Sequence, residues 1–151
     1  TLAKQAEKQH YITYMVTPDK DFAQLVSENI FCYRPARLGN GIEVWGVKEV
    51  QERFEVERPE QVVDFLGMMG DAVDNIPGFP GVGEVTAKKL LKEFGTVENL
   101  LANTDKLKGK MKENIENNAQ KGLLSKELAK IITDVPVEFH ETDFELNTPD
   151  F

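Results

Sequence analysis

The stretch GDAVDNIPGFPGVGEVTAKKLL, residues 70–91, decides how this sequence is interpreted. Two aspartates, Asp71 and Asp74, stand ahead of a segment rich in proline and glycine, and a lysine-bearing helical pattern follows. One interpretation is a well-capped turn between two helices, in which both carboxylates accept hydrogen bonds from nearby backbone. The other is a metal site beside a phosphate-binding loop. The local pattern alone favours the turn, so the rest of the chain has to decide.

The residues before this stretch predict an α/β arrangement. Residues 12–17 and 29–35 are rich in β-branched and aromatic side chains and predict two strands, while residues 19–28 between them have helical spacing. A helix that connects two strands of one sheet makes those strands parallel. Residues 42–46 predict a third strand, reached through a turn whose Asn40-Gly41 step is a strong hairpin signal.

The second part of the chain is predicted to be helical. Apolar periodicity indicates helices over residues 47–54, 59–70, 83–95, 96–103, 110–121 and 123–134. Their expected core positions include Val85, Leu90, Leu91, Phe94, Leu124, Leu128, Ile131 and Ile132. The remaining residues, 135–151, are polar and proline-marked and predict a final short strand or a linker.

Composition sets broad limits on the function. The 151 residues carry a net charge of −8, which argues against a protein that simply coats nucleic acid. It does not exclude DNA binding, because phosphate contacts depend on local basic patches. The single cysteine, Cys32, cannot form an internal disulfide and indicates a reducing cytoplasm. Both Cys32 and Trp45 are expected to pack in the core.

A second pair of carboxylates follows the first predicted strand. Asp19 and Asp21 lie in the segment TPDKD, at the carboxyl end of residues 12–17. Ligands of α/β folds bind beyond this end of the strands, and carboxylates there can hold a hard cation such as Mg²⁺. The alternative is that Thr17 or Asp19 caps the next helix and Asp21 favours its positive end. These five residues alone favour the cap.

The turn after Asp74 has the chemistry of a phosphate cradle. Gly81 and Gly83 permit positive φ and close approach of a ligand to the backbone. The helix that follows directs its free N–H groups into the same space. Thr86, Lys88 and Lys89 add a hydroxyl and two positive charges nearby. The pattern is neither a dinucleotide fingerprint nor a P-loop, and it fits a DNA backbone phosphate.

Taken together, TPDKD and residues 70–91 resemble the 5′-nuclease family found at the amino end of bacterial DNA polymerase I, within the wider flap endonucleases. The resemblance implies α/β architecture: the C-terminal part of a parallel-sheet nuclease domain joined to a mainly α helix-hairpin-helix lobe. It divides the chain into a partial core at residues 1–58, a DNA-binding lobe at 59–138, and a tail or linker at 139–151.

The resemblance also implies an activity and its ligands. Members of the family cleave phosphodiester bonds at DNA 5′ ends and flaps, in replication and repair, with Mg²⁺ or Mn²⁺. The metal ligands would be Asp19, Asp21, Asp71 and Asp74, with no catalytic residue beyond them. The DNA-binding residues would be Gly81, Val82, Gly83, Thr86, Lys88 and Lys89, with K⁺ held at the hairpin. The expected partners are DNA with 5′ ends or flaps and the polymerase domains of a longer chain, in the bacterial cytoplasm and without a membrane.

Several departures from the family pattern limit the expected activity. The family's other acidic ligands would precede Thr1, and its first strands and its arch have no counterpart here, so we expect a fragment with little or no catalysis of its own. Pro18 replaces a small residue, and Val85 replaces a lysine beside the hairpin. Two other functions stay open: a non-catalytic helix-hairpin-helix module that binds DNA, and a nuclease of related fold that acts on RNA.

Overall fold

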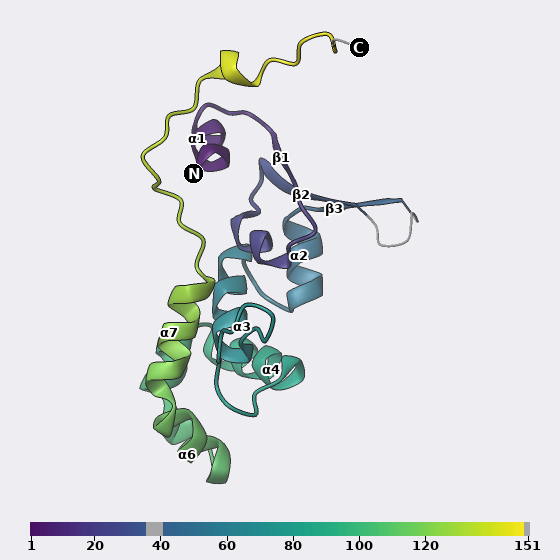
Figure 1. Ribbon diagram of the computed structural model, residues 1–151. Helices are drawn as coiled ribbons and strands as arrows, with labels where there is room; N and C mark the ends of the chain where they lie inside the picture. The colour runs from purple at the N-terminus through teal and green to yellow at the C-terminus, as the bar shows by residue number, and fades with distance from the viewer. Residues whose placement is uncertain (36–40, 150–151) are drawn as a thin grey trace.

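The computed structural model describes residues 1–35 and 41–149, and Figure 1 shows their arrangement. The N-terminal helix and the C-terminal tail lie at one end, the helices α6 and α7 reach the other, and the sheet lies between them. The first part contains α1 (Leu2–Lys8), β1 (Thr13–Val16), η1 (Lys20–Leu25), β2 (Ile30–Pro35), β3 (Ile42–Trp45) and α2 (Val47–Phe54). The second part contains η3 (Pro59–Gln61), α3 (Val62–Met69), α4 (Glu84–Phe94), α5 (Val97–Ala102), η4 (Thr104–Lys106), α6 (Gly109–Asn117), α7 (Ala119–Ala129) and η5 (Glu141–Phe144).

The sheet has the predicted strand directions. β1 pairs in parallel with β2, starting from Thr13 opposite Ile30, and β2 pairs antiparallel with β3. Cys32 and Trp45 face each other across β2 and β3, and both side chains are buried, as expected. The hairpin prediction at Asn40-Gly41 falls partly outside the described residues, since Asn40 is not among them.

The helix expected over residues 19–28 is wrong in type and length. η1 is a 3-10 helix that ends at Leu25, and Val26 already has extended backbone angles. Ser27 then donates to the carbonyl of Ile30 (3.1 Å), which starts β2. The side chain of Gln24 in η1 is buried. Its amide donates a hydrogen bond to Ala129 O (2.9 Å) and accepts one from Ile131 N (3.0 Å), so η1 is attached to the C-terminal end of α7.

Two predictions about the helical part need correction. The helix expected over 110–121 is interrupted at Asn118, whose side-chain amide donates to Asn114 O (2.8 Å) and so ends α6. In α4, Val85 is 82% exposed instead of buried, and Ala87 takes its place in the core. The other α4 core positions, Leu90, Leu91 and Phe94, are buried as predicted.

α7 buries a different face from the one its leucines predicted. Leu124, Leu128 and Ile132 are exposed, and Ile131 lies beyond the helix end. The buried residues are Gly122, Ser125 and Ala129. A Cβ atom at Gly122 would lie only 2.2 Å from the ring of Phe79. α7 therefore approaches its neighbours through small side chains, because larger ones would collide with Phe79 and with α3.

The chain crosses itself closely between α3 and α4. Gly70 and Gly78 both have positive φ, and a Cβ atom on Gly78 would lie 2.5 Å from the backbone nitrogen of Gly70. The crossing is held by hydrogen bonds from Phe79 N to Met68 O (3.0 Å) and from Gly78 N to Ser125 Oγ (2.8 Å). The loop of residues 71–77 is thereby fixed at both of its ends.

A buried ion pair joins three helices. Asp64 of α3, only 4% exposed, accepts a hydrogen bond from Val97 N at the start of α5 (2.9 Å) and pairs with Lys126 of α7 (2.6 Å). Lys126 also pairs with Glu98 (2.7 Å), whose side chain is far more exposed. Burial raises the pKa of Asp64, while Lys126 and the backbone donor oppose that rise. Sequence reasoning missed this network, because Asp64 had no visible partner.

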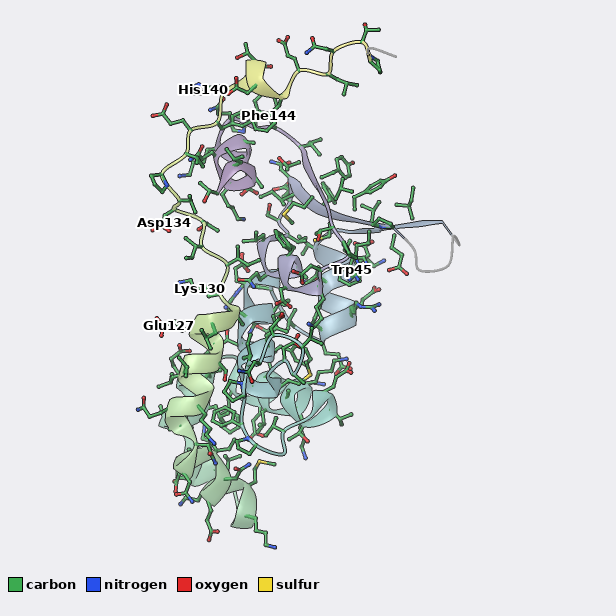
Figure 2. The ribbon with its side chains drawn as sticks, viewed as in Figure 1. Trp45, Glu127, Lys130, Asp134, His140 and Phe144 are labelled. Carbon is green, nitrogen blue, oxygen red and sulfur yellow. The ribbon has the colours of Figure 1, made fainter. Side chains whose placement is uncertain are left out.

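The C-terminal tail runs back from α7 to the N-terminal end of the molecule. Figure 2 shows it passing from Lys130 through Asp134 to His140 and Phe144, beside α1. Phe139 makes an edge contact with Tyr11, with ring centroids 5.4 Å apart. No strand occurs among residues 130–149, so the final strand is not formed and the tail is extended apart from η5.

One continuous core joins the sheet to the helices. It extends from Ala23 and Cys32 through Phe65 and Leu66 to Ile115. The core continues across residue 58 without a gap. The domain boundaries expected near residues 58 and 138 remain predictions. Among the described residues, no helix has the length and apolar character that crossing a membrane requires.

Replacing Gly78 with alanine should destabilise the protein strongly. Positive φ alone costs about 1–2 kcal/mol in an L-residue, and the Cβ atom would in addition collide with backbone that cannot move aside. Gly109→Ala is the matched control, because Gly109 also has positive φ but has open space around its Cβ position. Urea unfolding should show a clearly larger loss for Gly78→Ala. Equal losses would mean that the crossing tolerates a side chain.

Asp64→Ala should cost about 3 kcal/mol of unfolding free energy, because it leaves the Val97 N–H without its acceptor and the partly buried Lys126 ammonium with only the exposed Glu98. Glu98→Ala removes the exposed partner of the same ammonium and should cost about 1 kcal/mol or less. The comparison is made by urea unfolding at neutral pH. Similar losses for the two variants would contradict a structural role specific to Asp64.

Candidate metal centre and nucleic-acid interface

The TPDKD segment follows β1, as the sequence predicted. Asp19 caps η1, since its Oδ1 accepts a hydrogen bond from Asp21 N (2.9 Å). Thr17 Oγ1 in turn accepts from Asp19 N (3.2 Å). The capping interpretation therefore holds for Asp19, and the cap directly precedes Lys20 and Asp21 at the start of η1.

Lys20 joins the two acidic segments. Its ammonium donates to Asp71 Oδ2 and lies 3.3 Å from Asp21 Oδ1. Two carboxylates that are about 50 positions apart in the sequence thus share one positive charge. Sequence reasoning did not assign a role to Lys20, although its position between two aspartates was the available signal.

The pKa shifts follow from this shared charge. The hydrogen bond from Lys20 lowers the pKa of Asp71, and burial only partly offsets that effect. Burial raises the pKa of Asp21; Lys20 opposes the rise, and the charges of Asp19 and Asp71 add to it. For Lys20 itself, burial lowers the pKa, but Asp71 and Asp21 outweigh burial and the net pKa is raised. The three groups form one electrostatic unit in which Asp21 and Asp71 share the Lys20 ammonium.

Asp71 is held rigidly within its loop. Its backbone pairs with Ile76 in both directions (2.8 and 2.9 Å), and its Oδ1 accepts from Val73 N (2.9 Å). Asp74 lies on the same loop and is exposed. Asp19, Asp71 and Asp74 line one open cavity of about 820 Å³, together with Lys20 and Arg34. The structure thus brings all four predicted aspartates to one region, with Asp21 joined through Lys20.

The residues present fit a divalent cation in part. Asp21 Oδ1 is buried and, within the described part of the chain, has no hydrogen-bond partner, although the Lys20 ammonium is nearby. A carboxylate oxygen in that state is a good ligand for a hard cation. Within residues 1–35 and 41–149, however, no group of three or more His, Cys, Asp or Glu side chains has metal-binding geometry. Asp21 and Asp71 are therefore candidates for part of a ligand set, and their role as metal ligands stays a prediction.

The glycine-rich turn has the predicted openness with one difference. Gly81 has a φ of +74°, as expected, but Gly83 has a φ of −91° and serves as the N-cap of α4. A Cβ atom at either glycine would meet nothing within 4 Å, so both backbones are accessible to a ligand. The side chain of Val82 between them is buried and anchors the turn in the core. Only the backbone of Val82 is available for binding.

The predicted cationic residues differ in their availability. Lys88 pairs with Glu84 (2.9 Å) and lies 3.9 Å from Glu55, which holds its side chain against the protein. Lys89 is exposed, and Thr86 is half-buried in the first turn of α4. The first turn of a helix has N–H groups without helical acceptors. Lys89 and these N–H groups are the better candidates for phosphate contact.

Asn114 is a further residue at the turn that sequence reasoning missed. Its side-chain amide donates to Pro80 O (2.6 Å), which attaches α6 to the glycine-rich turn. Lys108 and Lys110 are exposed near the start of α6, whereas Lys112 pairs with Glu116 (4.0 Å). Nothing in the sequence spacing links Asn114 to Pro80, so only the fold reveals the contact.

Comparison with known families decides the identity. A family model described as 5′-3′ exonuclease, C-terminal SAM fold, matches residues 57–151. The chain belongs to this 5′-3′ exonuclease family. The family predicted from TPDKD and residues 70–91 is thereby confirmed.

Individual relatives of this exonuclease family agree with the assignment. DNA polymerase I of Bacillus caldotenax is 44% identical over 144 residues, which cover 95% of this chain and 16% of the polymerase. A 5′-3′ exonuclease of Aquifex aeolicus is 37% identical over 153 residues, which cover 99% of this chain and 49% of that protein. The chain therefore spans less than half of the length of these relatives.

Solved structures show the same fold. T5 5′-exonuclease with bound divalent zinc superposes with a TM-score of 0.71 at 20% identity, covering 85% of this chain and 46% of that one. A complex of the bacteriophage T5 flap endonuclease with DNA and metal ions gives a TM-score of 0.70 over the same 85% of this chain, also at 20% identity. The predicted fold class, part of an α/β nuclease domain with a helical lobe, is confirmed.

Removing the Lys20 charge should raise the pKa of Asp71 toward its ordinary value of 3.8. A carboxylate whose folded pKa is depressed contributes stability above its unfolded pKa and loses it as the pH falls through the folded pKa. Lys20→Met should therefore reduce the pH dependence of unfolding below about pH 4. Carbon-detected NMR titration of Asp71 measures the pKa directly, with the exposed Lys48→Met as control. An unchanged Asp71 pKa in Lys20→Met would show that Lys20 does not set it.

Proposed function

We propose that this chain is part of a metal-dependent nuclease that hydrolyses phosphodiester bonds at DNA 5′ ends and flaps. The observation that carries the proposal is the meeting of Asp21 and Asp71, from separate elements, around one positive charge at the edge of a cavity. Membership of the 5′-3′ exonuclease family and the fold shared with T5 5′-exonuclease support it. DNA replication and repair are the processes in which such an activity would serve.

In this proposal Asp21 and Asp71 hold Mg²⁺ or Mn²⁺, with Asp19 and Asp74 on the same cavity. Such an ion lowers the pKa of a bound water and offsets charge that develops on the phosphate. The protein's own contribution is positional: the Asp71–Ile76 backbone pairing and the Asp19 cap fix both carboxylates before a ligand arrives. The Lys20 side chain, 40% exposed, can turn its ammonium from the carboxylates to a phosphate oxygen.

The glycine-rich turn would hold the DNA backbone. Gly81 and Gly83 leave room for a phosphate, and the N–H groups of the first turn of α4 point out of the helix toward that space. Lys89 would add a charge-assisted contact. We also place K⁺ at the carbonyl groups of this turn, between protein and phosphate. These contacts depend on the shape of the DNA backbone and do not distinguish one base sequence from another.

The chain by itself should cleave DNA weakly. Its described residues supply part of a metal ligand set, and we propose that the missing ligands come from the length of the relatives that this chain does not span. The name DNA polymerase I among the relatives supports polymerase domains as partners in the same polypeptide. A bacterial cytoplasmic location is proposed as well, supported by the single, buried Cys32.

DNA binding by the glycine-rich turn is tested by fluorescence anisotropy of a labelled 5′-flap DNA, titrated with the chain in EDTA at several salt concentrations. Binding should weaken as salt rises, because phosphate contacts release counterions. Gly83→Asp, which puts a negative charge into the cradle, should lower the affinity by about tenfold or more. Thr148→Asp adds the same charge in the exposed tail and should change little. Equal effects of both variants, or preference for an RNA flap, would contradict the proposed DNA site.

The metal site is tested by calorimetric titration with Mn²⁺ and by cleavage of the same flap DNA in Mg²⁺. Asp71→Asn should lower Mn²⁺ affinity by about tenfold, because the carboxylate becomes a neutral amide. Glu52→Gln removes a charge from an exposed residue of α2 and serves as the control. Rapid Mg²⁺-dependent cleavage by the 151-residue chain would refute the proposal that this chain supplies only part of the metal ligands. Mn²⁺ binding that Asp71→Asn leaves unchanged would refute the site.

A further inference from the structure

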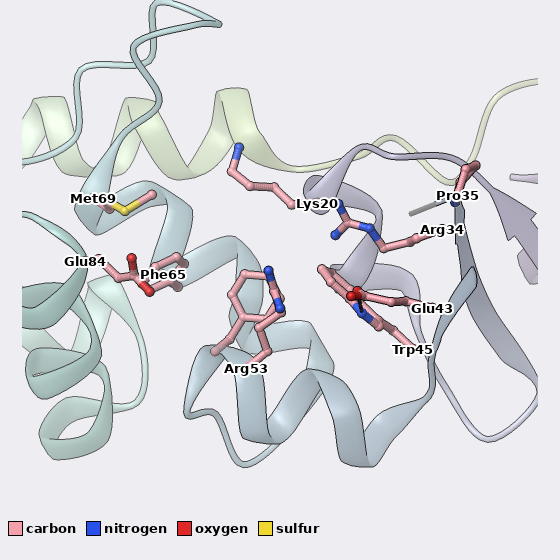
Figure 3. Close-up of a pocket in the computed structure, with 10 residues that line it drawn as sticks. Lys20, Arg34, Pro35, Glu43, Trp45, Arg53, Phe65, Met69 and Glu84 are labelled. Carbon is pink, nitrogen blue, oxygen red and sulfur yellow. Dashed lines mark hydrogen bonds between the residues drawn. The ribbon is translucent and has the colours of Figure 1, made fainter. Parts of the chain in front are cut away.

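Two arginines stack on the single tryptophan of the chain. Trp45, only 4% exposed, ends β3. The guanidinium carbon of Arg34, from β2, lies 3.8 Å from the Trp45 ring centroid, and that of Arg53, from the last turn of α2, lies 4.7 Å from it. Figure 3 shows both side chains reaching toward the ring from different elements. Sequence reasoning assigned Trp45 to packing alone and gave the arginines no role.

These residues line a second cavity beside the aspartates. It measures about 650 Å³, and its lining includes three cationic side chains: Lys20, Arg34 and Arg53. Lys20, Arg34 and Met69 also line the cavity that contains Asp19, Asp71 and Asp74. The two cavities are therefore neighbours with shared walls. A flexible chain bound at the aspartates would reach the arginines next.

The acidic residues of this cavity are already engaged. Glu43 accepts a hydrogen bond from the Trp45 indole nitrogen (3.1 Å). Glu84 pairs with Lys88 (2.9 Å), and the hydrogen bond from Lys88 lowers the pKa of its carboxyl. Among the described residues, Arg53 forms no ion pair within 4.0 Å, although its charge contributes to the lowered pKa of Glu84. Since Lys20 is shared by Asp21 and Asp71, the charge that this cavity offers to a ligand is that of Arg53.

We propose that Arg53, held over the Trp45 ring, binds a backbone phosphate of the DNA strand whose neighbouring phosphate lies at Asp21 and Asp71. The inference deepens the proposed nuclease function and rests on it. Contact with an aromatic ring uses the face of the Arg53 guanidinium and leaves its edge for bidentate hydrogen bonds, the geometry that phosphate matches. The contact with the indole restricts the Arg53 side chain before binding, so less side-chain freedom is lost when a phosphate binds.

The two arginines have different parts in this site. Arg34 donates to Pro18 O (2.7 Å), which links the stack to the loop that carries Asp19. Arg34 thus also positions that loop, and its replacement would act on two features at once. Arg53 is exposed on α2, and its replacement leaves the hydrogen bond between Arg34 and the Asp19 loop unchanged. Arg53 is therefore the cleaner residue to substitute.

The test uses Trp45 itself as the reporter, because no other tryptophan contributes to the emission. The 151-residue chain is titrated in EDTA with a 5′-phosphorylated thymidine tetranucleotide while the tryptophan fluorescence is recorded. A saturable change that weakens with salt is expected. Arg53→Gln should weaken the affinity by about tenfold, as loss of a charge-assisted pair of hydrogen bonds predicts, and Arg53→Lys should restore part of it. Arg58→Gln removes the same charge from an exposed residue outside the cavity and should leave the affinity unchanged.

The outcomes separate this inference from the proposed function. If Arg53→Gln binds the tetranucleotide as the unchanged chain does, or if no saturable signal appears, the stack is not a phosphate site. The nuclease proposal then still stands on Mn²⁺ binding at Asp71 and on flap binding at Gly83. If Arg53→Gln weakens binding but Mn²⁺ binding is absent, the phosphate site stands and the metal-dependent function falls. Thermal unfolding of Arg53→Gln close to that of the unchanged chain assigns the loss to binding.

Discussion

The close crossing of the backbone at Gly70 and Gly78 is the constraint on which the rest of the structure depends. No side chain fits there, so the loop between these glycines leaves α3 and returns to it at one point. The crossing presents Asp71 to Lys20 on one side. On the other side it aligns Phe79 against α7 and starts the turn that leads into α4. The acidic site and the glycine-rich turn are thus built on one piece of backbone.

Two lysines show how the same charge pairing serves different purposes. Lys126 lies between Asp64 and Glu98, and Asp64 also accepts a backbone hydrogen bond, so this group is satisfied within the protein and joins three helices. Lys20 lies between Asp21 and Asp71 at the edge of an open cavity. There a buried oxygen of Asp21 still lacks a hydrogen bond from the described residues. The first group is complete and structural, while the second is the group for which we propose a ligand.

Much of the fold followed from local patterns. The β-branched runs predicted the three strands, and the helical connection between the first two predicted their parallel pairing. Gly95 ended α4 and Thr96 capped α5 as their residue types imply. The exposed leucines of α7 were the main failure. Periodicity counts large apolar side chains as core, but the residues of α7 that are fully buried are the small Gly122, Ser125 and Ala129.

The sequence by itself determined the family, the acidic segments and the glycine-rich turn, because these depend on residue types at short spacing. Only the tertiary structure decided which side chains meet. It placed Lys20 between Asp21 and Asp71, tied Asn114 to Pro80, and stacked Arg34 and Arg53 on Trp45. These contacts join different helices and strands, and their geometry is set by how those elements pack. No local pattern carries that information, because burial and electrostatic pairing depend on the whole fold.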